Sequence, residues 1–187
     1  MKKINVIIFF VSISLMLSCG KKTETDSKEI SEDQNEEKFD STNIEGDTDF
    51  AIKAADGSLL EVQLGELAQT NGTSEEVKKF GQQMIKDHTQ AGTELKGLAA
   101  SKNISIPSTL SEESQNKYDD FAKMRGTDFD KDYSKFMVKD HKEDIDVFEK
   151  EASKGNDVEL KSWAADKVPT LKHHLMMAEE AEKSVNK

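Results

Sequence analysis

The chain has 187 residues, of which 34% are charged and 6% aromatic, and its formal net charge is -11 at pH 7. This length allows one domain of ordinary size with a hydrophobic core, and the composition favours helices with wide solvated faces. An acidic surface repels phosphate backbones, and no basic patch with interleaved aromatic residues occurs, which argues against nucleic-acid binding. The single cysteine, Cys19, precedes the region expected to fold, so cysteine-based catalysis and cysteine-based metal sites are excluded from the domain.

Residues 1–19 have the pattern of an export signal. Lys2 and Lys3 precede an apolar run over residues 4–17, which is too short for an ordinary membrane span. The run ends at Ser18-Cys19-Gly20, which resembles the bacterial lipoprotein box. The resemblance implies lipid on Cys19 and anchoring of the protein to a membrane of the bacterial envelope. A plain secretory signal with an incidental cysteine is the alternative.

Residues 20–46 consist mainly of Lys, Glu, Asp, Ser, Asn and Thr, with almost nothing apolar to bury. This composition predicts a disordered tether, with a mean span of roughly 30 Å, between the membrane and a domain over residues 47–187.

From residue 47 onwards, apolar residues recur at helical spacing. The pattern predicts long helices over residues 48–70, 74–102 and 127–154 and from residue 157 towards the C-terminus, with a short helix over residues 110–124. The fold class is therefore all-α: a four-helix bundle whose second and third long helices are joined by a crossover that carries the short helix. Gly57 lies inside the first long helix, where we expect a close neighbour or a bend, and Pro169 should kink the last helix.

A five-residue segment occurs twice, as MIKDH over residues 84–88 and as MVKDH over residues 137–141. Each copy places a histidine, His88 or His141, within the apolar seam of a long helix. Glu61 and His174 interrupt the seams of the other two long helices. At 1.5 Å per residue, each of the four lies roughly 21 to 26 Å into its helix, near its middle. Because the midpoints of near-parallel and antiparallel helices meet, we expect these four side chains to converge in the central layer.

Three neutral imidazoles and a carboxylate are a suitable ligand set for a divalent ion such as zinc, iron, nickel or copper. Met84 and Met137 lie one turn before His88 and His141, and their thioethers would suit copper as additional ligands. Asp87 and Asp140, about 100° around their helices from the histidines, are expected to orient ligands or bridge helices rather than bind the ion. The structural alternative is a hydrogen-bonded polar layer, with Glu61 accepting from the imidazoles, that fixes the bundle register. His173 is expected to be exposed.

The ordered set of motifs resembles a family of bacterial envelope proteins with a domain of unknown function and a ferritin-like helical fold, often labelled as predicted outer membrane proteins. The resemblance covers about residues 47–182 and is carried by residues 61–68 (EVQLGELA), 84–88, Gly126, Phe129-Asp130, Tyr133, His141, Pro169-Thr170-Leu171 and His174-Leu175. It implies a ferritin-like bundle in the cell envelope but no reaction. The di-iron site of ferritin-like proteins has a Glu three residues before each of two histidines. Here Ile85, Val138 and Leu171 stand at those positions, so di-iron chemistry is not carried over.

The first functional hypothesis is a lipid-anchored bundle that binds a metal ion or small ligand in mid-core. The second is a structural or stress-related envelope module whose polar core layer holds no ligand. The third is a metal-dependent enzyme, which ranks last because no nucleophile–base set and no second carboxylate pair are visible.

Overall fold

The computed structural model describes residues 26–187, and the expected export signal with Cys19 lies outside the described residues. The described part is entirely helical, with six helices and no strand: α1 (Ser27–Phe39), α2 (Glu45–Asn71), α3 (Glu75–Ser101), α4 (Glu112–Ala122), α5 (Gly126–Lys154) and α6 (Val158–Val185). Helices α2, α3, α5 and α6 are the four long helices predicted from the sequence, and α4 is the predicted short one. Among residues 26–187, no helix combines the length and the apolar character needed to cross a bilayer.

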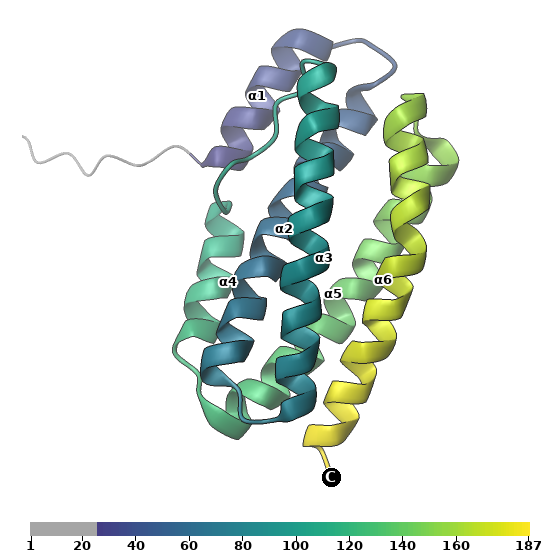
Figure 1. Ribbon diagram of the computed structural model, residues 1–187. Coiled ribbons are helices and arrows are strands. Elements are labelled where there is room, and N and C mark those ends of the chain that lie inside the picture. The colour runs from purple at the N-terminus through teal and green to yellow at the C-terminus, as the bar shows by residue number, and fades with distance from the viewer. Residues whose placement is uncertain (1–25) are drawn as a thin grey trace, which may run out of the picture.

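The four long helices form a bundle made of two closely packed pairs, α2 with α3 and α5 with α6 (Figure 1). Contacts of α3 with α6 and of α2 with α5 join the two pairs. In the first pair the backbones approach closely at Gly65 and Gly81. A Cβ on Gly65 would lie 2.7 Å from the Gly81 carbonyl oxygen, so only glycine fits there. The connection between α3 and α5 carries α4, which packs on α2.

The prediction of a disordered tether over residues 20–46 is wrong for residues 27–39, which form α1. This helix is held mainly by polar contacts, which a search for apolar periodicity does not detect. The buried Asn35 donates to the Ser105 carbonyl at 2.8 Å and accepts from the Ser105 amide at 2.7 Å. Asp26 accepts from the backbone amide of Lys28 in the first turn of α1 and from that of Glu112 in α4. The N-terminal helix is therefore fastened to the connection between α3 and α4.

Two apolar clusters fill the bundle, one on each side of its middle. One contains Phe80, Met84, Tyr133 and Met137 with their neighbours, and the other is centred on Phe50, Leu95, Ile145, Phe148 and Leu160. In every long helix, a short stretch of residues that belong to neither cluster separates the residues of one cluster from those of the other. His88, His141 and His174 fall in these stretches, and Glu61 lies between Leu60 and Leu64 at the edge of the first cluster. Polar side chains therefore lie where the two hydrophobic halves meet.

Candidate metal centre

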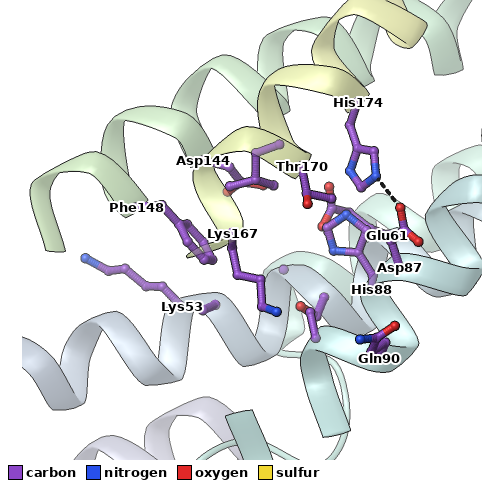
Figure 2. Close-up of a pocket in the computed structure, with 15 residues that line it drawn as sticks. Lys53, Glu61, Asp87, His88, Gln90, Asp144, Phe148, Lys167, Thr170 and His174 are labelled. Carbon is purple, nitrogen blue, oxygen red and sulfur yellow. Dashed lines mark hydrogen bonds and ion pairs between the residues drawn. The ribbon is translucent and has the colours of Figure 1, made fainter. Parts of the chain in front are cut away.

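The four side chains singled out in the sequence meet in the middle of the bundle. Glu61 comes from α2, His88 from α3, His141 from α5 and His174 from α6. Their exposed fractions are 1%, 6%, 0% and 0%, respectively. Figure 2 shows Glu61, His88 and His174 pointing toward one another across the core. The convergence expected from their heights along the helices is therefore found.

Glu61 lies between two of the imidazoles. Its Oε2 is 2.7 Å from His88 Nδ1, and its Oε1 is 3.5 Å from His141 Nε2. The ring centroids of His88 and His174 are 5.2 Å apart, those of His141 and His174 are 5.4 Å apart, and those of His88 and His141 are 6.0 Å apart. The three histidines each offer a ring nitrogen, and these nitrogens lie within 4.8 Å of one another. Metal–imidazole bonds are about 2.0–2.1 Å long, so binding of one ion by all three rings would require the rings to move inward.

Two of the imidazoles are oriented by hydrogen bonds from their other nitrogen. His141 Nδ1 donates to the carbonyl oxygen of Met137, one turn earlier in α5, at 3.1 Å. His174 Nε2 donates to Asp87 Oδ2 at 2.9 Å (Figure 2). Gln83 Nε2 donates to the same oxygen at 2.6 Å. A carboxylate accepts only, so the proton of His174 is on Nε2 and its Nδ1 carries the lone pair. Such carboxylate–histidine pairs hold metal ligands in the required tautomer and orientation.

The remaining polar atoms of this layer have no hydrogen-bond partner. Within the described residues, nine buried side-chain nitrogen and oxygen atoms lack one, and five of them belong to this layer: Glu61 Oε1, both ring nitrogens of His88, His141 Nε2 and His174 Nδ1. The short approach of Glu61 to His88 lacks hydrogen-bond geometry. A proton on Glu61 would satisfy only one of the imidazole nitrogens. Burying unpartnered polar atoms costs roughly 1–3 kcal/mol each, and a bound cation or ordered water in this layer would remove part of that cost.

The protonation states also suit a cation. Burial lowers the pKa of His88 to about 4, that of His174 to about 4 and that of His141 to about 3, so all three imidazoles are neutral at pH 7. Burial raises the pKa of Glu61 to about 8. The imidazoles are therefore in the unprotonated form that a metal ligand requires, and a metal ion would displace the proton of Glu61.

Two further carboxyl groups, both on α5, lie in or beside this layer. Asp140 forms a second potential ligand group with Glu61 and His141, whose donor atoms lie within 4.8 Å of one another. Burial, and then the charge of Glu61, raises the pKa of Asp140 to about 8. Asp144 has its pKa raised by burial and then by the charges of Glu61 and Asp140.

Sequence reasoning did not identify Asp144, and it gave Asp140 only a supporting role. The available signal was a carboxylate at the residue three after His141, one helical turn along the same face. The search for a di-iron pattern looked only at residues three before each histidine. Of the two supporting aspartates, Asp87 orients His174, whereas Asp140 is close enough to act as a ligand.

The other residues predicted near the site have ordinary roles in packing or on the surface. Met84 and Met137 are fully buried in the apolar cluster with Phe80 and Tyr133, and packing accounts for both. His173 is exposed, as expected. Gly57 has no close neighbour, so of the two reasons expected for this glycine, a close neighbour or a bend, the first is wrong. A Cβ there would enter open space beside the site.

A cavity of about 150 Å³ opens from the polar layer towards the surface. Glu61, His88 and His174 line its inner end together with Asp144 (Figure 2). Lys53 and Lys167 line its outer part, and Lys167 is paired with Glu94. The layer is therefore reachable from outside, unlike a fully packed core.

A comparison with protein families identifies the domain. The model of a domain of unknown function, DUF4142, matches residues 32–181. The chain belongs to this family. The DUF4142 match begins within α1 and includes Glu61, the three histidines, Asp87, Asp140 and Asp144. Searches of curated proteins and of solved structures gave no match.

Proposed function

We propose that this protein binds a divalent first-row transition-metal ion in the middle of its helical bundle, through His88, His141, His174 and Glu61. The observation that carries the proposal is the convergence of five buried, unpartnered nitrogen and oxygen atoms from four helices. Asp87 supports the site by fixing the ring of His174. The binding site belongs to the tertiary fold, because each long helix supplies one ligand.

The donor set indicates which ions would fit. Three imidazoles with a carboxylate suit zinc, iron, nickel or copper(II), whereas magnesium and calcium prefer oxygen ligands throughout. The methionine sulfurs are accounted for by core packing, so a soft copper(I) site receives less support than it did from the sequence.

The proposal includes an arrangement and a location. We propose that the four long helices form a ferritin-like bundle, which the long connection carrying α4 between α3 and α5 supports. We also propose that the protein is a lipid-anchored protein of the bacterial envelope. Support for this comes from Ser18-Cys19-Gly20 after an apolar run, in the sequence alone. Catalysis is not part of the proposal, since only the cavity beside the ligands favours it.

The test is metal analysis of the full chain purified without a histidine tag, in wild type and three variants. We expect at least one ion per chain in the wild type and a sharp fall in His88→Ala and His141→Ala. The matched control is His173→Ala, which removes the exposed neighbour of His174 and should leave metal content unchanged. Chelation should lower the melting temperature of the wild type, because an ion present at 100 times its Kd stabilises the folded state by about 2.7 kcal/mol.

The competing structural hypothesis makes the opposite predictions. If the polar layer serves only to fix the register of the helices, wild-type metal content stays at background and chelation leaves melting unchanged. In that case the histidine variants would still lose stability, since each leaves neighbours unpartnered.

A further inference from the structure

The cluster contains five side chains that could bind a metal, and they fall into two groups. The three histidines form one potential ligand group, and Glu61, Asp140 and His141 form another. The two groups overlap at His141. Asp144 belongs to neither group and lines the cavity that Glu61 and His88 also line (Figure 2).

The histidine tautomers determine how these donors can be shared. His141 Nδ1 is held by the Met137 carbonyl, so only Nε2 is free and His141 can bind one ion at a time. Nε2 faces Glu61 Oε1, whereas the other oxygen, Oε2, faces His88. Glu61 thus has one oxygen directed to each side of the layer, which is the geometry of a bridging carboxylate.

Several carboxyl groups also lie near the layer without a cationic partner in the described part of the protein. The carboxylates of Glu61, Asp87, Asp140 and Asp144 all lie in or beside it. Within residues 26–187, no lysine or arginine forms an ion pair with Glu61, Asp140 or Asp144. Asp87, by contrast, is paired with Lys86 at 3.9 Å. Glu61 and Asp140 therefore offer carboxylate oxygens to a second cation, which would displace their protons on binding.

We propose that the layer holds two divalent cations bridged by Glu61, one bound by His88 and His174 and the other by His141 and Asp140. This rests on the metal binding proposed above and adds a second position to it. Two ions that share a bridging carboxylate are typically about 3.5–4 Å apart.

The two positions differ in chemical preference. The first is dominated by imidazole nitrogen and suits zinc, copper(II) or nickel. The second has two carboxylates and one imidazole, so it favours harder ions such as manganese(II) or iron(II). It is also the weaker position for an imidazole-seeking ion, which predicts sequential filling in a titration.

Cobalt(II) titration of the chelator-treated full chain tests the second position, with visible absorption to count ions and electron paramagnetic resonance to detect coupling between them. The wild type should bind two cobalt ions per chain, with a coupled signal once both are bound. Asp140→Asn should bind one ion with the first affinity unchanged, and the second affinity should fall at least 100-fold. The control is Asp146→Asn, which removes the same charge from an exposed position of α5 and should still bind two. Circular dichroism confirms that each variant is folded.

Each alternative result overturns a different statement. A wild type that binds a single cobalt ion, or an Asp140→Asn variant that still binds two, removes the second position and leaves the single site standing. Loss of all cobalt binding in folded Asp140→Asn means that Asp140 is a ligand of one shared site, which also rejects the two-ion arrangement. A wild type that binds none rejects the proposed function together with this inference.

Discussion

Asp130 and Glu61 are both buried carboxylates of the bundle, with exposed fractions of 2% and 1%, but they have different neighbours. Asp130, in α5, accepts hydrogen bonds from the amide and hydroxyl of Thr73 and from the amide of Ser74, at the N-terminus of α3. Asp56, in α2, does the same for Ser111 and Ser114 at the N-terminus of α4. Asp130 and Asp56 each cap the N-terminus of another helix, and their carboxylate oxygens accept hydrogen bonds from groups at that terminus.

Glu61 faces imidazole nitrogens that are themselves unpartnered, and one of its own oxygens is unpartnered too. The contrast separates two uses of a buried charge. At the ends of the helices, free backbone amides satisfy the carboxylates and the result is structural. In the middle of the bundle every backbone amide is already bonded within its helix, so side chains that face one another there have only each other, water from the cavity or a ligand as partners. The five unpartnered nitrogen and oxygen atoms of the middle layer are therefore the main support for the metal binding proposed above.

The largest difference is expected between variants that remove one carboxylate of each kind, Asp130 at a helix end and Glu61 in the middle layer. Asp130→Ala should lower the free energy of unfolding by about 2–4 kcal/mol, because several buried donors lose their acceptor, and metal content should not change. Glu61→Gln should weaken metal binding at least 100-fold, while changing the stability of the metal-free protein by less than about 1 kcal/mol. Urea unfolding in a chelator and metal analysis give the two readouts. Equal destabilisation by both variants would show that Glu61 is structural as well.

A smaller effect is expected from the carboxylate that contacts a ligand without binding the ion. Asp87→Asn keeps the shape of the side chain but removes the charge that holds the proton on His174 Nε2. Metal affinity should fall about 10–100-fold, with the metal-free melting temperature nearly unchanged. Competition with a chromophoric chelator measures the affinity. Wild-type affinity in this variant would mean that the orientation of His174 does not depend on Asp87.

The smallest expected effect is the change in the stability of the metal-free protein with pH. Burial raises the pKa of Glu61 to about 8, so between pH 4.5 and 8 the folded protein holds a proton that the unfolded chain has released. The contribution of the protonated Glu61 to the free energy of unfolding is fully present below pH 4.5 and is lost as the pH rises through 8. Between pH 7 and pH 9 this loss amounts to about 1.4 kcal/mol for one group.

The three histidines act in the opposite direction and in a different range. Their pKa values are lowered in the folded state, so the unfolded chain binds protons first and stability falls as the pH drops below about 6.5. Thermal melts of Glu61→Gln and of the wild type in a chelator, from pH 7 to pH 9, isolate the contribution of Glu61. Parallel curves for the two proteins would contradict the assignment of the buried proton to Glu61.

The site could be predicted from the sequence only as far as helical geometry extends. The MIKDH and MVKDH segments, together with Glu61 and His174, placed four polar side chains at the same height in four seams, and the structure brings them together. The second carboxylates were missed for a physical reason. Whether Asp140 or Asp144 reaches the layer depends on how far α5 is rotated about its axis against α2, and the spacing of residues along α5 does not contain that rotation. The helix α1 was missed because its burial relies on Asn35 and Asp26, whose partners are 70 and 86 residues away in the chain.

The all-helical class, the extents of five helices and the positions of Glu61 and the three histidines near the middle of their helices could all be predicted from the amino-acid sequence. These features follow from the 3.6-residue period and the 1.5 Å rise, which are local properties of the chain. Only the tertiary structure decided which ring nitrogens remain free, which aspartates join the layer and where the cavity opens. Those features depend on hydrogen bonds and charges between different helices. Such contacts are set by the relative rotation and approach of the helices, including the close passage at Gly65 and Gly81.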